Sequence, residues 1–163
     1  MDTTQSVVVG VGDCGFSNNM GDTLVTYALG SCVAITVHDP VGHIGGLLHF
    51  MLPESSLDPE KAGRQPFMFA DTGVPLMFEK LSNLGADKKR LQVKVAGGAQ
   101  MIEGSATFNI GKRNALAIKK LLWKAGVMIQ GEELGGTVSR SIMLEVGSGK
   151  VSLKEVQSRG GTQ

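Results

Sequence analysis

The chain has 163 residues, of which 42% are hydrophobic and 23 are glycine; it is too apolar for a disordered protein and lacks the strict glycine period of collagen. Sixteen basic against fifteen acidic residues leave a net charge of +1, so no overall field favours nucleic acid or an acidic membrane surface. The N-terminus lacks a signal-peptide pattern and no apolar run reaches transmembrane length, so we expect a cytoplasmic protein without direct membrane insertion.

The sequence predicts short strands and two helices within one domain that spans residues 1–163. In the first half we expect strands at residues 6–9, 23–28, 31–38 and 43–51, a loop at 10–21, a turn at 39–42 and a mobile polar loop at 54–65. Asp71 or Thr72 is expected to cap a helix that ends at Asn83, with Pro75 tolerated in its first turn.

The second half continues the alternation of strands and helices. We expect a buried strand at residues 91–96, a helix at 111–125 capped by Asn109, and a strand at 127–131. Residues 139–146 and 150–153 flank a glycine-rich turn and predict a hairpin, and residues from about 155 to 163 are expected to form a flexible tail. These elements place the chain in the α/β (α+β) class.

The strands at 31–38 and 43–51 form an expected hairpin that brings a thiol and an imidazole together. With a symmetric loop centred on Pro40 and Val41, Cys32 lies directly opposite His49 on one face of the sheet. A bulge in this loop would shift the register. The other face carries the apolar side chains and is expected to pack on the core: Val33, Ile35, Val37, Ile44, Leu48 and Phe50.

A cysteine beside a histidine is typical of enzymes that use a thiolate nucleophile. A protonated imidazole depresses the thiol pKa, and the thiolate of the resulting ion pair attacks carbonyl carbons. The backbone N–H groups of the turn Gly30-Ser31-Cys32 are candidates for stabilising the oxyanion. The alternative, in which Cys32 is a small core residue and His49 a strand histidine with satisfied hydrogen bonds, stays open on these residues alone.

Other motifs give weaker signals, and none of them predicts a cofactor or a metal. Residues 10–15 fit the dinucleotide pattern G-x-G-x-x-G, but no helix is expected after them. His38, Asp39 and His43 flank a turn that accounts for them without a metal. Cys14 is either an incidental thiol or a redox partner that would switch Cys32 off through a disulfide, and two cysteines are too few for a cysteine-based zinc site.

Several spaced blocks of the sequence resemble one protein family. The blocks are LGSCVA at 29–34, GGLLH at 45–49, AGGAQM at 96–101, NIGKRN at 109–114, and GG at 135–136 followed by RS at 140–141. In this order they are similar to the chemoreceptor glutamine deamidase family, CheD, of bacterial and archaeal chemotaxis. The resemblance extends from about residue 7 to residue 153.

The resemblance implies a substrate, a set of catalytic residues and a fold. Members of the family hydrolyse the side-chain amide of glutamines in the cytoplasmic helices of methyl-accepting chemotaxis receptors, without a cofactor, and some bind a CheC-type phosphatase. The catalytic cysteine, histidine and threonine of the family correspond to Cys32, His49 and Thr26. The implied fold has mixed or antiparallel sheets packed together with helices outside, like the catalytic domain of cytotoxic necrotizing factor.

Two other functions remain as alternatives to the deamidase. The chain would act as a non-catalytic partner or regulator of a CheC-type phosphatase, or as a thiol protease or transglutaminase with the same cysteine and histidine. The first alternative does not need the thiol of Cys32. The second predicts backbone cleavage or amine incorporation instead of ammonia release alone.

Overall fold

The computed structural model describes residues 5–100 and 109–156, and within these ranges the strands form two sheets. The four-stranded sheet has the order β1 (Gln5–Val8), β3 (Asp22–Leu29), β8 (Ser139–Glu145) and β9 (Val151–Val156). The five-stranded sheet has the order β2 (Asp13–Ser17), β5 (Ile44–Phe50), β4 (Val33–Asp39), β6 (Gln92–Gly97) and β7 (Ile129–Leu134). Each sheet contains one parallel pair, β1 with β3 and β6 with β7, and is otherwise antiparallel.

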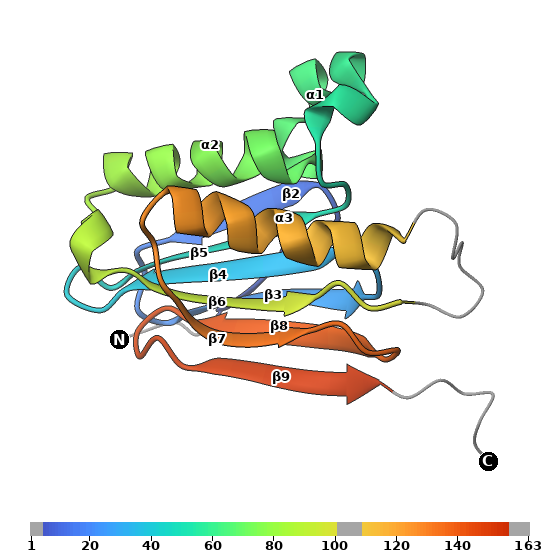
Figure 1. Cartoon of the computed structure of the whole chain (residues 1–163). Helices are drawn as coiled ribbons and strands as arrows, with labels where there is room; N and C mark the ends of the chain where they lie inside the picture. The colour runs from blue at the N-terminus through green and yellow to red at the C-terminus, as the bar shows by residue number, and fades with distance from the viewer. Residues whose placement is uncertain (1–4, 101–108, 157–163) are drawn as a thin grey trace.

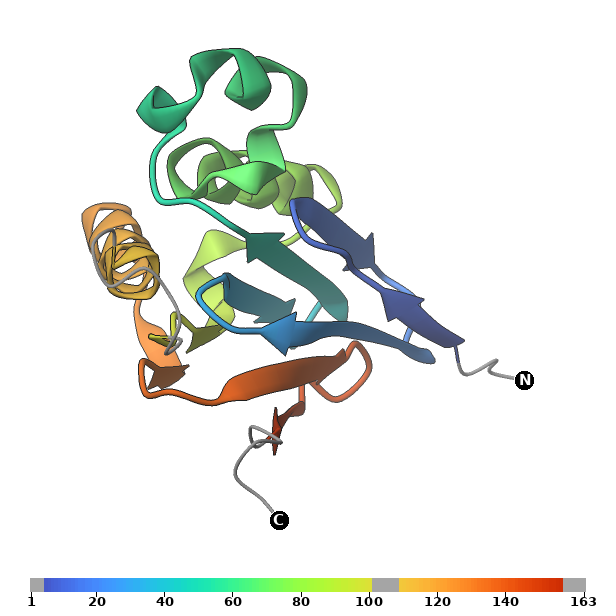
Figure 2. The ribbon, with the colours of Figure 1, turned by 90° about the vertical axis from the view of Figure 1, so that its right-hand side faces the viewer.

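The molecule is layered, with the five-stranded sheet in the middle. Helices α2 (Ala70–Asn83) and α3 (Ile110–Lys124) cover its outer face, and the four-stranded sheet packs on its inner face (Figures 1 and 2). The short helix α1 (Pro59–Arg64) lies beyond the start of α2 (Figure 1). The expected class, packed sheets with helices outside, is therefore confirmed, while the likeness to cytotoxic necrotizing factor stays a prediction.

Two apolar cores lie on the two faces of the five-stranded sheet. The outer core joins β4 and β5 to the helices through Val33, Ile35, Leu48, Phe50, Met77, Leu81, Ile118 and Leu122. It contains every side chain that strand alternation assigned to the apolar face of the hairpin. The inner core, between the sheets, contains Leu24, Leu29, Ala34, Leu47, Ile142 and Leu144, and Cys32 packs against it.

Three stretches differ from the expected elements. Residues 13–17 form the edge strand β2 instead of a loop, because Cys14 and Phe16 pack against the outer core and the backbone pairs with β5. The polar stretch 54–65 is ordered as the 3-10 turn η1 (Ser55–Leu57) and α1, followed by a second 3-10 turn, η2 (Pro66–Met68). The strand β9 continues to Val156, two residues into the expected tail, and the rest of that tail lies outside the described residues.

The expected helix caps are not formed by side chains. Helix α2 begins at Ala70, so Pro75 is its sixth residue and lies beyond the first turn. Asp71 instead accepts hydrogen bonds from the backbone N–H and hydroxyl of Ser55, at 2.8 and 2.9 Å, and Thr72 donates to a carbonyl of η2. Both side chains thus tether the η1–η2 segment to the helix. Asn109 occupies the N-cap position of α3 with a left-handed backbone but makes no capping hydrogen bond.

Candidate active site

The β4–β5 hairpin sets the positions of the candidate nucleophile and base. Ala34, not Cys32, pairs with His49, because Asp39 pairs with Ile44 and four residues connect the strands. The expected direct opposition of Cys32 and His49 is therefore wrong by two positions. A shift of two preserves the face, so Cys32 stays on the His49 side as a diagonal neighbour, with about 7–8 Å between such residues in a regular ladder.

The connection between β4 and β5 is two residues longer than expected, and the buried carboxylate of Asp39 organises it. It accepts the backbone N–H groups of Val41 and Gly42, at 2.9 and 3.1 Å, and the guanidinium of Arg90, at 2.8 and 3.0 Å. The Arg90 guanidinium holds the pKa of this carboxyl well below its usual range. The turn is thus organised around a fixed anion, which a count of loop residues does not reveal.

Thr26 and His49 meet between the two sheets. Thr26 comes from β3 and His49 from β5, and each is only 1% exposed. The Thr26 hydroxyl oxygen lies 2.7 Å from Nδ1 of His49 and 2.6 Å from the carbonyl oxygen of Val9. Two of the three residues that the family resemblance suggested are therefore in direct contact.

These two hydrogen bonds determine which nitrogen of His49 carries the proton. A hydroxyl has one hydrogen to donate, and a carbonyl oxygen such as that of Val9 can only accept. Thr26 therefore donates to Val9 and accepts from Nδ1–H of His49. The other ring nitrogen, Nε2, is buried without a hydrogen-bond partner among the described residues, and in this tautomer it carries a free lone pair.

Cys32 lies in the crossover from β3 to β4, where the chain passes from one sheet to the other. The carbonyl oxygens of this turn are all held: Gly98 N–H donates to Cys32 at 2.8 Å and Ala99 N–H donates to Gly30 at 2.9 Å. The amide of Asn114, from α3, donates to the carbonyl of Ser31 at 2.9 Å. The backbone that carries the thiol is therefore fixed by three hydrogen bonds from other elements.

Asn114 is a site residue that the sequence analysis missed. It is fully buried on the inner face of α3, and its amide also donates to the carbonyl of Met51 at 2.9 Å. The available signal was a polar side chain between Gly111 and Ile118 on the apolar face of a predicted helix. Buried amides need partners, so such a residue indicates a hydrogen-bonding role toward the backbone beneath the helix.

The turn also leaves backbone donors unused. The N–H groups of Ser31 and Cys32 donate to no residue in the described ranges, whereas the carbonyls of the same turn are occupied. Gly97 packs so closely on the turn that a Cβ there would collide with the carbonyl oxygen of Cys32, and its φ of +114° also favours glycine. The close packing of Gly97 fixes the direction of the turn beside the thiol.

Burial shifts the pKa values of the two ionisable groups away from an ion pair. It raises the pKa of the Cys32 thiol and lowers that of His49 from 6.5 to about 4. Both directions favour a neutral thiol beside a neutral imidazole. The expected depression of the Cys32 pKa by a protonated histidine is thus opposite to what this environment produces in the free protein.

The second cysteine lies on the other side of the sheet. Cys14 pairs with Leu48 on β5 and packs against the outer core, whereas Cys32 packs against the inner core. Burial, followed by the charge of Asp13, raises the pKa of the Cys14 thiol. Both cysteines are free and pack against opposite faces of one sheet, a placement that disfavours the alternative of a switching disulfide between them.

The residues around the hairpin turn have structural partners. His38 Nε2 lies 2.7 Å from the carbonyl oxygen of Val146, and His43 Nδ1 lies 3.0 Å from that of Gly147. Asp39 binds Arg90, as described above. In the part of the chain that the structure describes, no three histidine, cysteine or acidic side chains gather closely enough to hold a metal ion.

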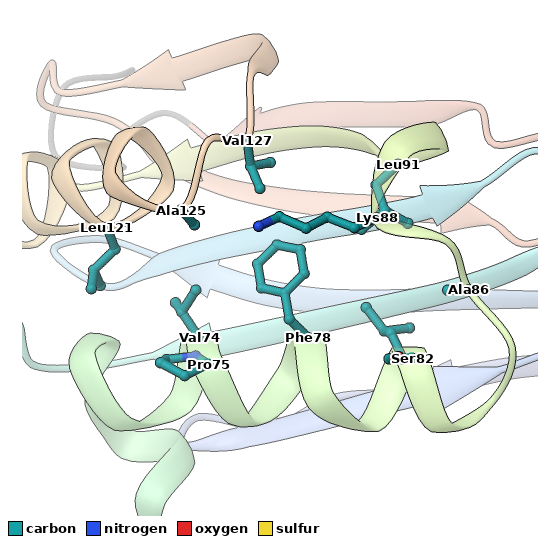
Figure 3. A pocket seen from close by; sticks show the side chains of 11 residues that line it. Val74, Pro75, Phe78, Ser82, Ala86, Lys88, Leu91, Leu121, Ala125 and Val127 are labelled. Carbon is teal, nitrogen blue, oxygen red and sulfur yellow. The ribbon is translucent and has the colours of Figure 1, made fainter.

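An apolar pocket of about 280 Å³ lies between α2 and α3, away from the thiol. Its walls include Val74, Phe78 and Leu121, and the side chain of Lys88 extends across it toward the end of α3 (Figure 3). These walls belong to the outer core, on the opposite face of the sheet from His49. The pocket is thus separate from the candidate active site.

Comparison with known proteins gives a family match and several similar relatives. Residues 51–155 match the family described as CheD chemotactic sensory transduction. The chain belongs to the CheD family. A Solibacter usitatus protein named probable chemoreceptor glutamine deamidase CheD is 48% identical over 151 residues, which cover 93% of this chain and 89% of that protein.

Two further CheD relatives match over similar lengths. The probable chemoreceptor glutamine deamidase CheD 1 of Syntrophus aciditrophicus is 51% identical, covering 91% of this chain and 92% of that protein. The chemoreceptor glutamine deamidase CheD of Thermotoga maritima is 40% identical, covering 91% of each chain. Among the described residues, no helix of this CheD protein has the length and apolarity needed to span a membrane.

Proposed function

We propose that this protein hydrolyses the side-chain amide of glutamines in methyl-accepting chemotaxis receptors to glutamate, with Cys32 as nucleophile and His49 as base. The relatives are named for this activity, and each of them matches about nine-tenths of the chain. The single observation that carries the assignment of roles is the hydrogen bond of 2.7 Å between Thr26 and Nδ1 of His49. It leaves Nε2 as the basic nitrogen on the face that His49 shares with Cys32.

The reaction begins when the glutamine amide enters the site. His49 Nε2 takes the thiol proton as the sulfur of Cys32 attacks the amide carbon, so thiolate character develops only during attack. The unused N–H groups of Ser31 and Cys32, in the turn that begins at Gly30, are the donors we assign to the oxyanion. Collapse of the tetrahedral intermediate breaks the C–N bond, and the imidazolium protonates the departing ammonia.

A water molecule completes the reaction. Neutral His49 takes a proton from the water as its oxygen attacks the thioester carbon, and the thiolate leaves and is reprotonated by the imidazolium. The products are a glutamate side chain and the original thiol. Thr26 is neutral, so it orients the imidazole through its oxygen without supplying the negative charge that an aspartate gives in a serine protease triad.

The test compares Cys32→Ala with wild-type protein and with a matched Cys14→Ala control. Each is incubated with the purified cytoplasmic fragment of a methyl-accepting receptor, and released ammonia and glutamine-to-glutamate changes are measured by enzymatic assay and mass spectrometry. Wild type and Cys14→Ala are expected to deamidate the fragment and Cys32→Ala to be inactive. Full activity of Cys32→Ala would refute the role of Cys32 as the nucleophile, and an inactive wild-type protein would refute the proposed deamidase function.

The same samples test the alternative functions. A regulator of a CheC-type phosphatase that needs no catalysis would act equally well as wild type and as Cys32→Ala. A thiol protease would shorten the receptor fragment. A non-catalytic regulator does not require the buried contact between Thr26 and His49. A thiol protease would use it too, so the names of the relatives are what favours the deamidase over that alternative.

A further inference from the structure

An exposed methionine lies across the sheet from the candidate nucleophile. The β4–β5 ladder pairs Val33 with Phe50. The same register, continued by one residue, sets Met51 opposite Cys32, and strand alternation directs Met51 to the face that carries His49. Directly opposed residues have Cβ atoms about 4.5–5.5 Å apart, so by register Met51 lies nearer to Cys32 than the diagonal His49 does.

The hydrogen bonds of Asn114 support this placement. Its single amide nitrogen donates to the carbonyls of Ser31 and Met51, each at 2.9 Å, so the residue before the nucleophile and the residue across from it converge on one atom. The N–H of Met51 donates to the carbonyl of Met68 in η2, also at 2.9 Å. The backbone of Met51 is thus held at its N–H and at its carbonyl, while the residue is 41% exposed.

A second exposed apolar residue lies next to the same site. Val11, in the loop between β1 and β2, is 53% exposed. Before it, the carbonyl of Val9 accepts the hydroxyl of Thr26. After it, the N–H of Gly12 donates to the carbonyl of His49 at 2.7 Å. The loop that carries Val11 is therefore tied at both ends to residues of the candidate active site.

We define the apolar rim as Val11 and Met51. A Cβ on Gly12, next to Val11, would collide with Met68, whose carbonyl holds Met51, so the two parts of the rim share one support. Strands β3 and β6 end at the right of Figure 1, and Figure 2 turns that end of the sheets toward the viewer. Single exposed apolar side chains are ordinary on a protein surface, but two that border a nucleophile contact whatever enters its site.

We propose that the apolar rim selects the target glutamine by binding an apolar side chain of the protein substrate, three or four residues from that glutamine on the same face of a substrate helix. This rests on the proposed function, because it concerns how the same site chooses among glutamines. Side chains at this helical spacing have Cβ atoms about 5–6 Å apart, close to the separation of about 4.5–5.5 Å between Cys32 and Met51. An extended segment matches less well, since its next side chain on the same face is about 6.6 Å away.

The surroundings of the rim favour an apolar partner over an acidic one. Asp13 is exposed and lies beside His49 in the β2–β5 register, two residues from Val11 along the chain. Its negative charge would repel a carboxylate next to the target glutamine, whereas an apolar side chain meets Met51 without the desolvation of a charge. Methionine is unbranched and flexible, so it adapts to aliphatic side chains of different shapes. The rim therefore selects apolar character and not one particular residue.

Kinetics with the purified receptor cytoplasmic fragment test the contact of Met51. Met51→Ala is expected to raise KM about 10-fold, the scale of one buried apolar side chain, with kcat nearly unchanged, and Met51→Leu should stay close to wild type. The matched control is Met143→Ala, because Met143 is 43% exposed but lies on β8, where it alternates with the inner-core residues Ile142 and Leu144. This control should have the KM of wild type. An unchanged KM in Met51→Ala would overturn the proposal.

A double-mutant cycle tests whether the rim meets the expected position of the substrate. Mass spectrometry first identifies a modified glutamine in the fragment, and each apolar residue three or four positions from it is then replaced by alanine. One replacement should raise KM for wild-type protein but cause no further increase for Met51→Ala, because both changes remove the same contact. Additive effects at every such position would overturn the rim, as would a modified glutamine without an apolar residue at these positions. Those outcomes leave the deamidase standing, whereas no ammonia release by wild type would overturn the proposed function and the rim with it.

Discussion

The protonation of His49 gives the sharpest test of how this site works. Burial lowers the pKa of its imidazole from 6.5 in the unfolded chain to about 4 in the folded protein. Between these values the unfolded state binds the proton and the folded state does not, so the free energy of unfolding falls as the pH drops from 6.5 to 4. The difference between the two pKa values corresponds to a total loss of about 3 kcal/mol in the free energy of unfolding, which is a large part of a typical domain's stability.

Urea unfolding at several pH values between 8 and 4 measures this contribution. The His49→Asn variant should show a shallower loss of stability over this range, and its stability at pH 8 gives the cost of the substitution itself. An NMR titration of the three histidines, with the His49 signal assigned by its absence from the variant, should place its midpoint near 4. The acid limb of kcat/KM should fall at the same pH, because the base must be neutral.

A midpoint at or above 6.5 would refute this reasoning. It would mean that the imidazole is stabilised as a cation, as in a preformed thiolate–imidazolium pair. The same conclusion would follow if Cys32 reacted with iodoacetamide at pH 6 as fast as a thiolate does. With burial raising the pKa of the thiol, we expect its alkylation to accelerate only in the alkaline range.

Three further substitutions test the supports of the site. Thr26→Val should lower kcat about 10- to 100-fold and destabilise the fold by about 1–3 kcal/mol, since it leaves a buried carbonyl and imidazole without their partner. Thr26→Ser keeps the hydroxyl and should retain most of the wild-type kcat and stability. Equal kcat in wild type and both variants would contradict the orienting role of Thr26. Gly97→Ala should displace the nucleophile turn and abolish turnover, whereas Gly63→Ala, where a Cβ meets nothing within 4 Å, should leave kcat unchanged. Asp39→Asn should cost about 1–3 kcal/mol in urea unfolding because it weakens the hydrogen bonds from two turn N–H groups and from the partly exposed guanidinium, and a loss below 1 kcal/mol would show that the turn does not depend on the charge.

Local patterns predicted much of the fold. Alternation in the hairpin assigned Val33, Ile35 and Phe50 to one face, and the helical spacing of Ile118 and Leu122 assigned the buried side of α3. These features depend on neighbours within a few residues, so they are readable from the sequence. Strand β2 was missed because its glycine-containing sequence becomes a strand only by pairing with β5.

The site was harder to predict because its contacts are distant in sequence. Strand parity placed Cys32 and His49 on one face, but the exact register depended on how Asp39 organises the turn through a residue 51 positions away. Thr26 was suggested by the family resemblance alone, since its hydroxyl reaches His49 from the other sheet. The role of Asn114 follows from a contact across 83 positions, which no local pattern encodes.

Under the proposed function, these distant contacts explain how the neutral pair of Cys32 and His49 remains unreactive until substrate arrives. Each layer of the fold contributes one support: the four-stranded sheet orients the imidazole through Thr26, the five-stranded sheet carries His49, and the helical layer holds the turn before Cys32 through Asn114. Because burial disfavours both charges, the proposed proton transfer from sulfur to nitrogen becomes favourable only when an amide carbon accepts the electron pair of the sulfur and backbone N–H groups donate hydrogen bonds to the oxyanion. The orientation is thus built into the resting fold, while the charge separation develops only in the transition state, where its stabilisation accelerates the reaction.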